Sequence, residues 1–149
     1  MWWQTGRIAA QVKGELIRHG AIYDGDRTET ADCVSGTGKG TGLPDKEFIG
    51  KTAAWLAQKA GFAVPEHTKV LVSEQSYITD FNPYAKGLLC PVLAFYIEED
   101  WIHACEKCIE LLVGESRGNT LTIHSQDPEV IRQFALKKPD RPVAIYHSQ

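Results

Sequence analysis

The chain has 149 residues, of which 43% are apolar and 23% are charged, a composition typical of one soluble globular domain. The net charge is −3 and no block of lysine and arginine is present, which argues against nucleic-acid binding. No apolar run approaches the roughly 18 residues of a membrane span, and the first residues lack the pattern of a secretory signal. We therefore expect a cytoplasmic protein with no membrane partner.

The first predicted helix covers residues 5–18, because Ile8, Val12 and Leu16 recur at a spacing of four. Gly20 is placed to end this helix, and a short strand is expected at residues 21–23. Residues 24–44 carry five glycines and almost no apolar periodicity, which predicts a long surface loop. A loop of this length is uncommon in a compact domain, so we expect a lid or a partner surface there.

A second helix is predicted from Lys46 to Ala60, with Asp45 as its cap and Gly61 at its end. The residues expected on its buried face are Phe48, Ile49, Thr52, Ala53, Leu56 and Ala60. A short strand follows at residues 69–72. The continuous apolar run of residues 91–97 is typical of a strand that is buried on both faces.

Asp100 is the predicted cap of the next helix, and another strand is expected at residues 120–123. The run Asp127-Pro128-Glu129 is a strong helix start, because it combines a cap, a proline at the first position and an acid in the first turn. A final strand is predicted at residues 142–146. This alternation predicts a single α/β domain, residues 1–149, with a mainly parallel sheet flanked by helices.

Two local motifs invite functional interpretations. Residues 36–42 read GTGKGTG, but Lys39 is followed by Gly40, so the spacing of a phosphate-binding loop is not met. Cys105 and Cys108 form a CxxC, but both fall on the apolar face of the predicted helix. Core packing is the favoured interpretation, and a thiol-based redox function is the alternative.

Residues at strand ends are a further source of site candidates. His124 and Glu74 each end a predicted strand, where side chains can reach a ligand cleft. A partly exposed histidine and a solvated carboxylate are the favoured interpretations, and no metal site is expected. Serine hydrolysis has no support, because neither a GxSxG elbow nor an HGGG motif is present.

Four ordered segments resemble a known family. They read GELIRHGAIY, then EFIGKTAAWLAQKAGFAVPEHTKVLVSE, then LLCPVLAFY, and last GNTLTIHS with the DPEVIRQFALKKP that follows it. Together they resemble the C-terminal part of the catalytic domain of the aldehyde dehydrogenase superfamily. The resemblance is to the CoA-acylating branch, of the acetaldehyde and propionaldehyde type.

The resemblance implies a thioester route. In this family a cysteine thiolate attacks an aldehyde, a hydride passes to NAD(P), and the acyl group is released to CoA. That cysteine sits shortly before the segment that resembles residues 1–12, and no cysteine is present there. Cys33 and Cys90 fall in segments where the family has no catalytic cysteine.

Two further family positions are changed. Gly87 stands where the family usually carries a glutamate that binds the cofactor ribose, four residues before Pro91 in the same cofactor-binding segment. Asn119 stands where the acylating branch carries a histidine thought to assist catalysis, and asparagine cannot shuttle a proton near neutral pH. NAD(P) and CoA are therefore implied by the family, while binding by this chain alone is doubtful.

These departures predict a fragment or a degenerate relative of an acylating aldehyde dehydrogenase that is inactive alone. A complementing N-terminal chain or a homo-oligomer is the expected partner, beside aldehyde and acyl-CoA small molecules. The alternative is a non-enzymatic binding or assembly module, with residues 24–44 and the pair Trp2-Trp3 as contact surfaces. The resemblance also suggests an association with a bacterial microcompartment.

Overall fold

The computed structural model of the protein describes residues 2–23, 46–78, 82, 84, 88–114, 121–137 and 143–146. For residues 2–7 and 143–146 the description covers the backbone alone. The described elements, in chain order, are β1 (Trp2–Thr5), α1 (Gly6–Arg18), β2 (Ala21–Tyr23), η1 (Lys46–Phe48), α3 (Ala53–Lys59), β3 (Val70–Glu74), β4 (Val92–Glu98), α4 (Trp101–Gly114), β5 (Leu121–His124), α5 (Pro128–Lys137) and β6 (Val143–Tyr146).

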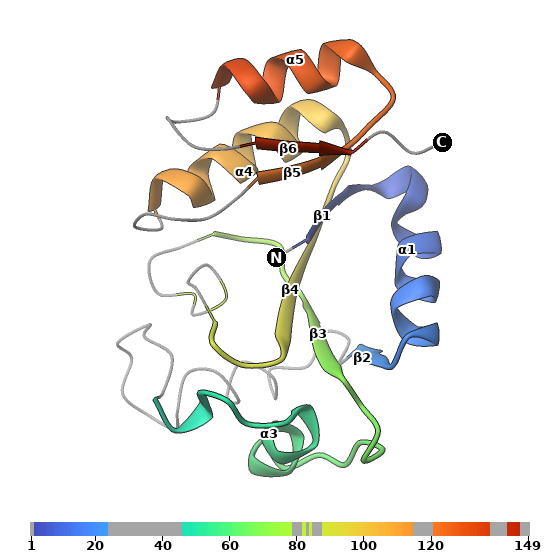
Figure 1. Ribbon diagram of the computed structural model, residues 1–149, viewed down its shortest axis with the longest axis vertical. Coiled ribbons are helices and arrows are strands. Elements are labelled where there is room, and N and C mark those ends of the chain that lie inside the picture. The colour runs from blue at the N-terminus through green and yellow to red at the C-terminus, as the bar shows by residue number, and fades with distance from the viewer. Residues whose placement is uncertain are drawn as a thin grey trace.

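All pairings between the described strands are parallel. One sheet has four strands in the order β1-β4-β3-β2, and a second sheet consists of β5 and β6. The helices α4 and α5 gather with β5 and β6 at one end of the molecule, while α3 lies at the other end and α1 lies beside the sheet (Figure 1). The predicted α/β class with a mainly parallel sheet is thereby confirmed.

The four-stranded sheet is covered on both faces because successive side chains of its strands point in opposite directions. The core on the α3 side consists of Phe48, Ala53, Leu56, Ala57, Leu71, Tyr84, Val92, Ala94 and Tyr96. The core on the α1 side consists of Ala9, Ala21, Val72 and Phe95. Ala94 and Phe95 are neighbours in β4 that serve different cores, which explains why the apolar run of β4 is continuous rather than alternating.

A third core lies under α4 and α5. Its buried members are Cys105, Cys108, Ile123 and Phe134, with Trp101 and Ile109 packed beside them. Both cysteines are therefore packing residues, as the favoured interpretation of the CxxC predicted.

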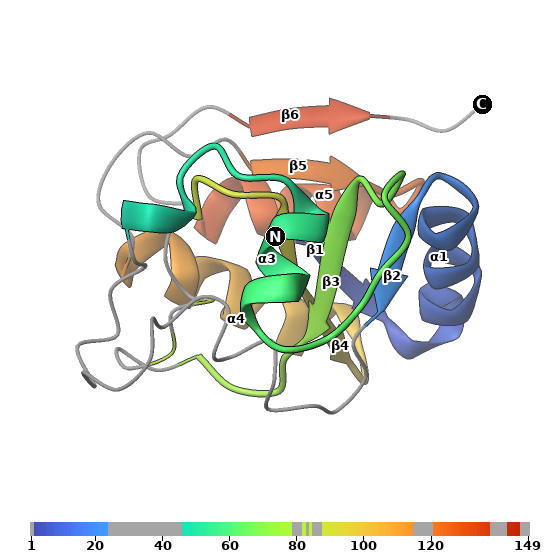
Figure 2. The same ribbon diagram turned by 90° about the horizontal axis from the view of Figure 1, so that it is seen from below.

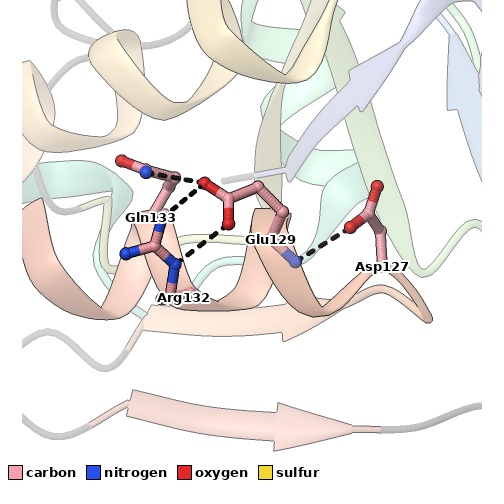
Figure 3. A network of polar contacts seen from close by, with 4 residues as sticks. All are labelled: Asp127, Glu129, Arg132 and Gln133. Atoms are coloured by element: carbon pink, nitrogen blue, oxygen red, sulfur yellow. Dashed lines mark hydrogen bonds and ion pairs between the residues drawn. The ribbon is translucent and has the colours of Figure 1, made fainter.

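The start of α5 follows the predicted pattern (Figure 3). The backbone N–H of Glu129 donates to Oδ1 of Asp127 at 2.9 Å, which satisfies one of the free N–H groups of the first turn. The Glu129 carboxylate accepts hydrogen bonds from Arg132 at 2.8 and 2.9 Å and from the amide of Gln133 at 2.8 Å. The Arg132 guanidinium lowers the pKa of Glu129.

Asp100 likewise caps α4. Its Oδ1 accepts from the backbone N–H groups of Ile102 and His103, each at 2.9 Å, as the sequence predicted. The same oxygen contacts Nδ1 of His103 at 2.9 Å, and this contact raises the pKa of the imidazole.

The predicted helix from Lys46 to Ala60 is wrong in its first half. A short 3-10 turn, η1, is followed by Gly50 at φ 72°, and α3 starts only at Ala53. A positive φ interrupts a helix, and glycine adopts it without a steric penalty. Thr52 was expected to be buried, but it is the N-cap, and its hydroxyl accepts from the N–H of Trp55 at 3.2 Å. Ile49, also expected in the core, is 51% exposed.

The strand β1 was not predicted. It pairs with β4, with Trp2 opposite Phe95 and Thr5 opposite Glu98. The two tryptophans that were expected to form a contact surface therefore belong to a sheet strand, and their side chains lie outside the description. The whole of the predicted loop, residues 24–44, also lies outside the described residues. It includes Cys33 and the motif of residues 36–42.

Candidate functional site

A groove of about 590 Å³ opens at the amino ends of β3 and β4. Its lining residues are Gly50, Lys51, Thr52, Ala53, Thr68, Lys69, Leu88, Leu89, Cys90 and Pro91. In Figure 2, α3 lies in front of the strands at this side of the sheet. The groove is shallow and open to solvent rather than enclosed.

Backbone hydrogen bonds hold the walls of the groove together. The N–H of Gly50 donates to the carbonyl of Leu89 at 3.1 Å, which joins the turn before α3 to the segment before β4. The N–H of Leu71 donates to the carbonyl of Pro91 at 2.9 Å, which continues the β3–β4 pairing to the groove floor. The groove therefore rests on the sheet rather than on a free loop.

The charge of the groove is positive. Lys51 and Lys69 line it, and the described lining includes no acidic residue. Nζ of Lys51 lies 5.2 Å from the centroid of the Trp55 ring on α3, a cation–π contact. Among the described residues, no carboxylate lies within ion-pair distance of either lysine. Such a surface favours an anionic ligand.

Cys90 is the half-buried thiol of the groove. Burial raises the pKa of its thiol, and the backbone N–H of Val92 offsets part of that rise. The thiol is therefore protonated near neutral pH and is a weak nucleophile there.

Thr68 adds a polar group to the wall. The residue is only 8% exposed, and its buried Oγ1 has no hydrogen-bond partner among the described residues. A buried hydroxyl of this kind costs free energy until it finds a partner.

Of the residues proposed from the family resemblance, the structure places Pro91 in the groove wall. Gly87 and Asn119 lie outside the described residues. The lysines of the groove were not singled out from the sequence, since Lys51 and Lys69 are far apart in the chain and only the folded sheet brings them to one groove.

The other candidate residues have structural roles. The carboxylate of Glu74 pairs with Nζ of Lys13, which ties α1 to β3. Burial raises the pKa of Cys105, and it raises the pKa of Cys108 to about 12. These shifts oppose the thiolate that redox chemistry requires. His124 is exposed at the end of β5.

Within the described part of the chain, no group of three or more His, Cys, Asp or Glu residues is arranged to hold a metal ion. None of the described helices has the length and apolarity that crossing a membrane requires.

The chain is similar to known enzymes over part of their length. No protein-family model matches it. It is 31% identical to an aldehyde-alcohol dehydrogenase of Streptococcus pneumoniae over 88 residues, which are 59% of this chain and 10% of that enzyme. It is 31% identical to the acetylating succinate-semialdehyde dehydrogenase of Clostridium kluyveri over 122 residues, which are 82% of this chain and 27% of that enzyme.

Solved structures agree with these relatives. An acetylating aldehyde dehydrogenase from Geobacillus thermoglucosidasius superposes with a TM-score of 0.84 at 27% identity, covering 96% of this chain and 31% of that one. A propionaldehyde dehydrogenase from Rhodopseudomonas palustris, solved with bound propionyl-CoA, has the same fold with a TM-score of 0.77 at 22% identity, covering 95% of this chain and 31% of that one.

The fold is thus that of part of an aldehyde dehydrogenase catalytic domain. More particularly, the homologues and structural neighbours of this chain are acylating aldehyde dehydrogenases, as the sequence resemblance predicted. The chain spans from about a tenth to about a third of the length of these enzymes.

Proposed function

We propose that this chain is part of an acylating aldehyde dehydrogenase that holds a phosphate-bearing ligand in the groove and has no aldehyde turnover by itself. The observation that carries the assignment is the structural match, which keeps the fold over 96% of this chain and covers 31% of the Geobacillus enzyme.

The groove supplies binding rather than chemistry. Lys51 and Lys69 provide positive charge for the phosphates of CoA or NAD(P), and Leu88 and Pro91 provide an apolar surface beside them. When bound, NAD(P) would supply the hydride acceptor and CoA the thiol that takes the acyl group. The residues of this chain would position and partly desolvate such ligands.

Two positions to which the resemblance gives a part in the reaction carry other residues here. Gly87 cannot accept hydrogen bonds from a ribose through its side chain, and Asn119 cannot act as a general base. These two differences support the absence of turnover.

The test measures binding and turnover separately. The purified chain is incubated with a short aldehyde, CoA and NAD, and NADH is followed by absorbance, while the binding of CoA is measured by calorimetry. We expect no NADH, and we expect CoA binding that weakens about tenfold in the double variant Lys51→Gln/Lys69→Gln, because two cations near phosphates are lost.

Lys107→Gln, which removes a lysine from α4 outside the groove, is the matched control and should leave the affinity unchanged. CoA-dependent NADH formation would contradict the proposed inactivity. Equal CoA affinity of the wild type and the double variant would remove the groove from the proposal.

An assembly module is the second candidate function. The observation that favours it is the exposure of Ile49 and Leu89, at 51% and 69%, on two segments joined by the Gly50–Leu89 hydrogen bond. Neighbouring exposed apolar side chains are typical of protein contact surfaces. Sedimentation velocity would detect a homo-oligomer, and the double variant Ile49→Ser/Leu89→Ser should shift the protein to the monomer if this surface is used.

Association with a microcompartment stays a prediction. One structural neighbour, at 18% identity and a TM-score of 0.75, is a propionaldehyde dehydrogenase from a fucose-utilisation microcompartment of Clostridium phytofermentans. Co-purification of this chain with shell proteins from its host would test the association.

A further inference from the structure

The groove carries an exposed apolar rim beside its two lysines. This rim consists of Ile49 and Leu89, and the hydrogen bond from the N–H of Gly50 to the carbonyl of Leu89 holds their two segments together. Lys51 and Lys69 line the groove next to the rim, and both are exposed. An open surface that combines apolar side chains with positive charge fits a convex partner that is both apolar and acidic.

The outer face of α4 is a surface of this kind. It presents Ile102, Glu106, Glu110 and Val113, whose spacings of four, four and three residues place them on one side of the helix. The two apolar members of this α4 face are 45% and 71% exposed. Neither glutamate forms an ion pair within the described part of the chain.

The negative charge of the α4 face continues to the start of the helix. The carboxylate of Asp100 raises the pKa of the His103 imidazole, and Glu106 and Glu99 raise it further, so these carboxylates act on one small region. Lys107 lies on the flank of the α4 face rather than within it. The α4 face is therefore acidic, whereas the groove is basic.

The two surfaces lie at opposite ends of the molecule. The helix α4 belongs to the group of elements at one end, and α3, whose start lines the groove, lies at the other (Figure 1). One molecule therefore cannot place its own α4 face in its own groove, but two copies can meet head to tail. Because such a contact uses a different surface on each copy, one groove and one α4 face stay free, and further copies can add.

We propose that the groove docks the α4 face of a second copy of this chain, and that this contact competes with the phosphate-bearing ligand. The two apolar side chains of the α4 face contact the apolar rim, and its two glutamates pair with the two groove lysines. The competition rests on the proposed function, because it requires the ligand to occupy the same groove, whereas the docking does not. A ligand that binds only the free groove dissociates the assembly by mass action.

Sedimentation velocity of the purified chain over a range of concentrations tests the docking. We expect species larger than a dimer that grow with concentration and shrink at high salt, which screens exposed charges. The double variants Lys51→Glu/Lys69→Glu and Glu106→Lys/Glu110→Lys should each weaken association at least about tenfold, because like charges then face each other. Glu15→Lys, on α1 outside both surfaces, is the matched control and should associate like the wild type.

An equimolar mixture of the two double variants separates docking from a general loss of folding. The acidic groove of one variant then faces the basic α4 face of the other, and the remaining two surfaces are those of the wild type. We expect the mixture to assemble although each variant alone stays monomeric. A mixture that stays monomeric, a wild type that is monomeric or stops at the dimer, or association that persists in both double variants would overturn the inference.

Calorimetry with CoA on Glu106→Lys/Glu110→Lys, whose groove is unchanged, distinguishes the docking from the proposed function. If CoA binds this variant and the wild type never associates, the docking fails and the binding function stands. If the wild type assembles and the mixture is rescued but CoA does not bind, the docking stands and the binding function fails. If CoA binds in the groove without reducing the assembly of the wild type, the competition is wrong.

Discussion

The buried hydroxyl of Tyr23 lowers the free energy of unfolding, although the ring that carries it is well packed. The ring packs edge-on against Phe95, with centroids 6.1 Å apart and an interplanar angle of 80°. Nζ of Lys13 lies 5.5 Å from the Tyr23 ring and pairs with Glu74. The ring is thus well packed, but its buried hydroxyl oxygen has no hydrogen-bond partner in the described part of the chain.

Removing that hydroxyl should stabilise the protein. Tyr23→Phe keeps the ring contacts and is expected to raise the free energy of unfolding by about 1 kcal/mol, because the penalty of an unsatisfied buried hydroxyl disappears. Urea denaturation measures the change. Tyr77→Phe, on a side chain that is 74% exposed, is the control and should have almost no effect. A loss of stability in Tyr23→Phe would show that the hydroxyl has a partner in solution.

The residues of the site were only partly predictable from the sequence. The PVLAFY run and the family resemblance pointed to Pro91, and the apolar spacing of Cys105 and Cys108 correctly indicated core packing. Lys51 and Lys69 were not predicted, because isolated surface lysines have no pattern that distinguishes a groove wall from a solvated face. Lys69 reaches the groove at the start of β3, and Lys51 reaches it through the Gly50–Leu89 hydrogen bond. Both placements are tertiary features.

Among the elements, α3 is the shortest described α-helix, and both of its ends are held by specific groups. Thr52 caps its start. At its end Gly61 has φ 89°, its N–H donates to Gln58 at 3.1 Å, and the N–H of Phe62 donates to Ala57 at 3.0 Å. This is the Schellman arrangement, in which a residue with positive φ satisfies the last carbonyls of a helix.

Two glycine-to-alanine changes should therefore have opposite effects. Gly61→Ala is expected to lower the free energy of unfolding by about 1 kcal/mol, because alanine is strained at a positive φ. Gly14→Ala lies within α1, where an added Cβ meets no atom within 4 Å, and should raise it by up to about 1 kcal/mol through helix propensity. Chemical denaturation of both variants gives the comparison, and stabilisation by Gly61→Ala would rule out the capping role.

The elements themselves were predicted well where periodicity and capping agreed. The helices after Asp100 and Asp127 start where their side-chain caps required. The prediction failed between Lys46 and Thr52, because apolar spacing there continued through Gly50 and could not reveal its positive φ. It also failed for Trp2–Thr5, where four residues become a strand only through pairing with β4.

At the scale of the whole molecule, buried weak acids make the free energy of unfolding fall as the pH becomes alkaline. Burial raises the pKa of Tyr96 from 10.0 and that of Cys108 from 9.0, each to about 12. The unfolded chain loses these protons first, so their contribution is complete below pH 9 and is lost as the pH rises towards 12.

The free energy of unfolding should therefore fall at high pH, on the order of 3 kcal/mol for each of the two groups. Urea midpoints across this pH range measure the fall. In Cys108→Ala the protein starts less stable, but the part of the decline that begins near pH 9 should be smaller, because that thiol no longer titrates. A decline of the same steepness in the variant and the wild type would show that Cys108 does not contribute.

The three cores also predict how the molecule opens. In the four-stranded sheet, β3 lies between β2 and β4, and β4 lies between β1 and β3, so both central strands are paired on two sides. In the described structure β5 pairs with β6 alone, and the core beneath it has fewer buried members than the core on the α3 side. A two-stranded sheet with a small core has less burial to resist local opening.

Native-state hydrogen exchange should resolve this difference. We expect the amides of Val72 and Phe95, both 0% exposed, to exchange only through global unfolding and to follow the denaturant dependence of the whole protein. The amide of Ile123 in β5 should exchange earlier and depend less on denaturant, because β5, β6 and α5 can open while the larger sheet stays folded. If all three amides share one denaturant dependence, the chain unfolds as a single cooperative unit, and the predicted local opening of β5, β6 and α5 is wrong.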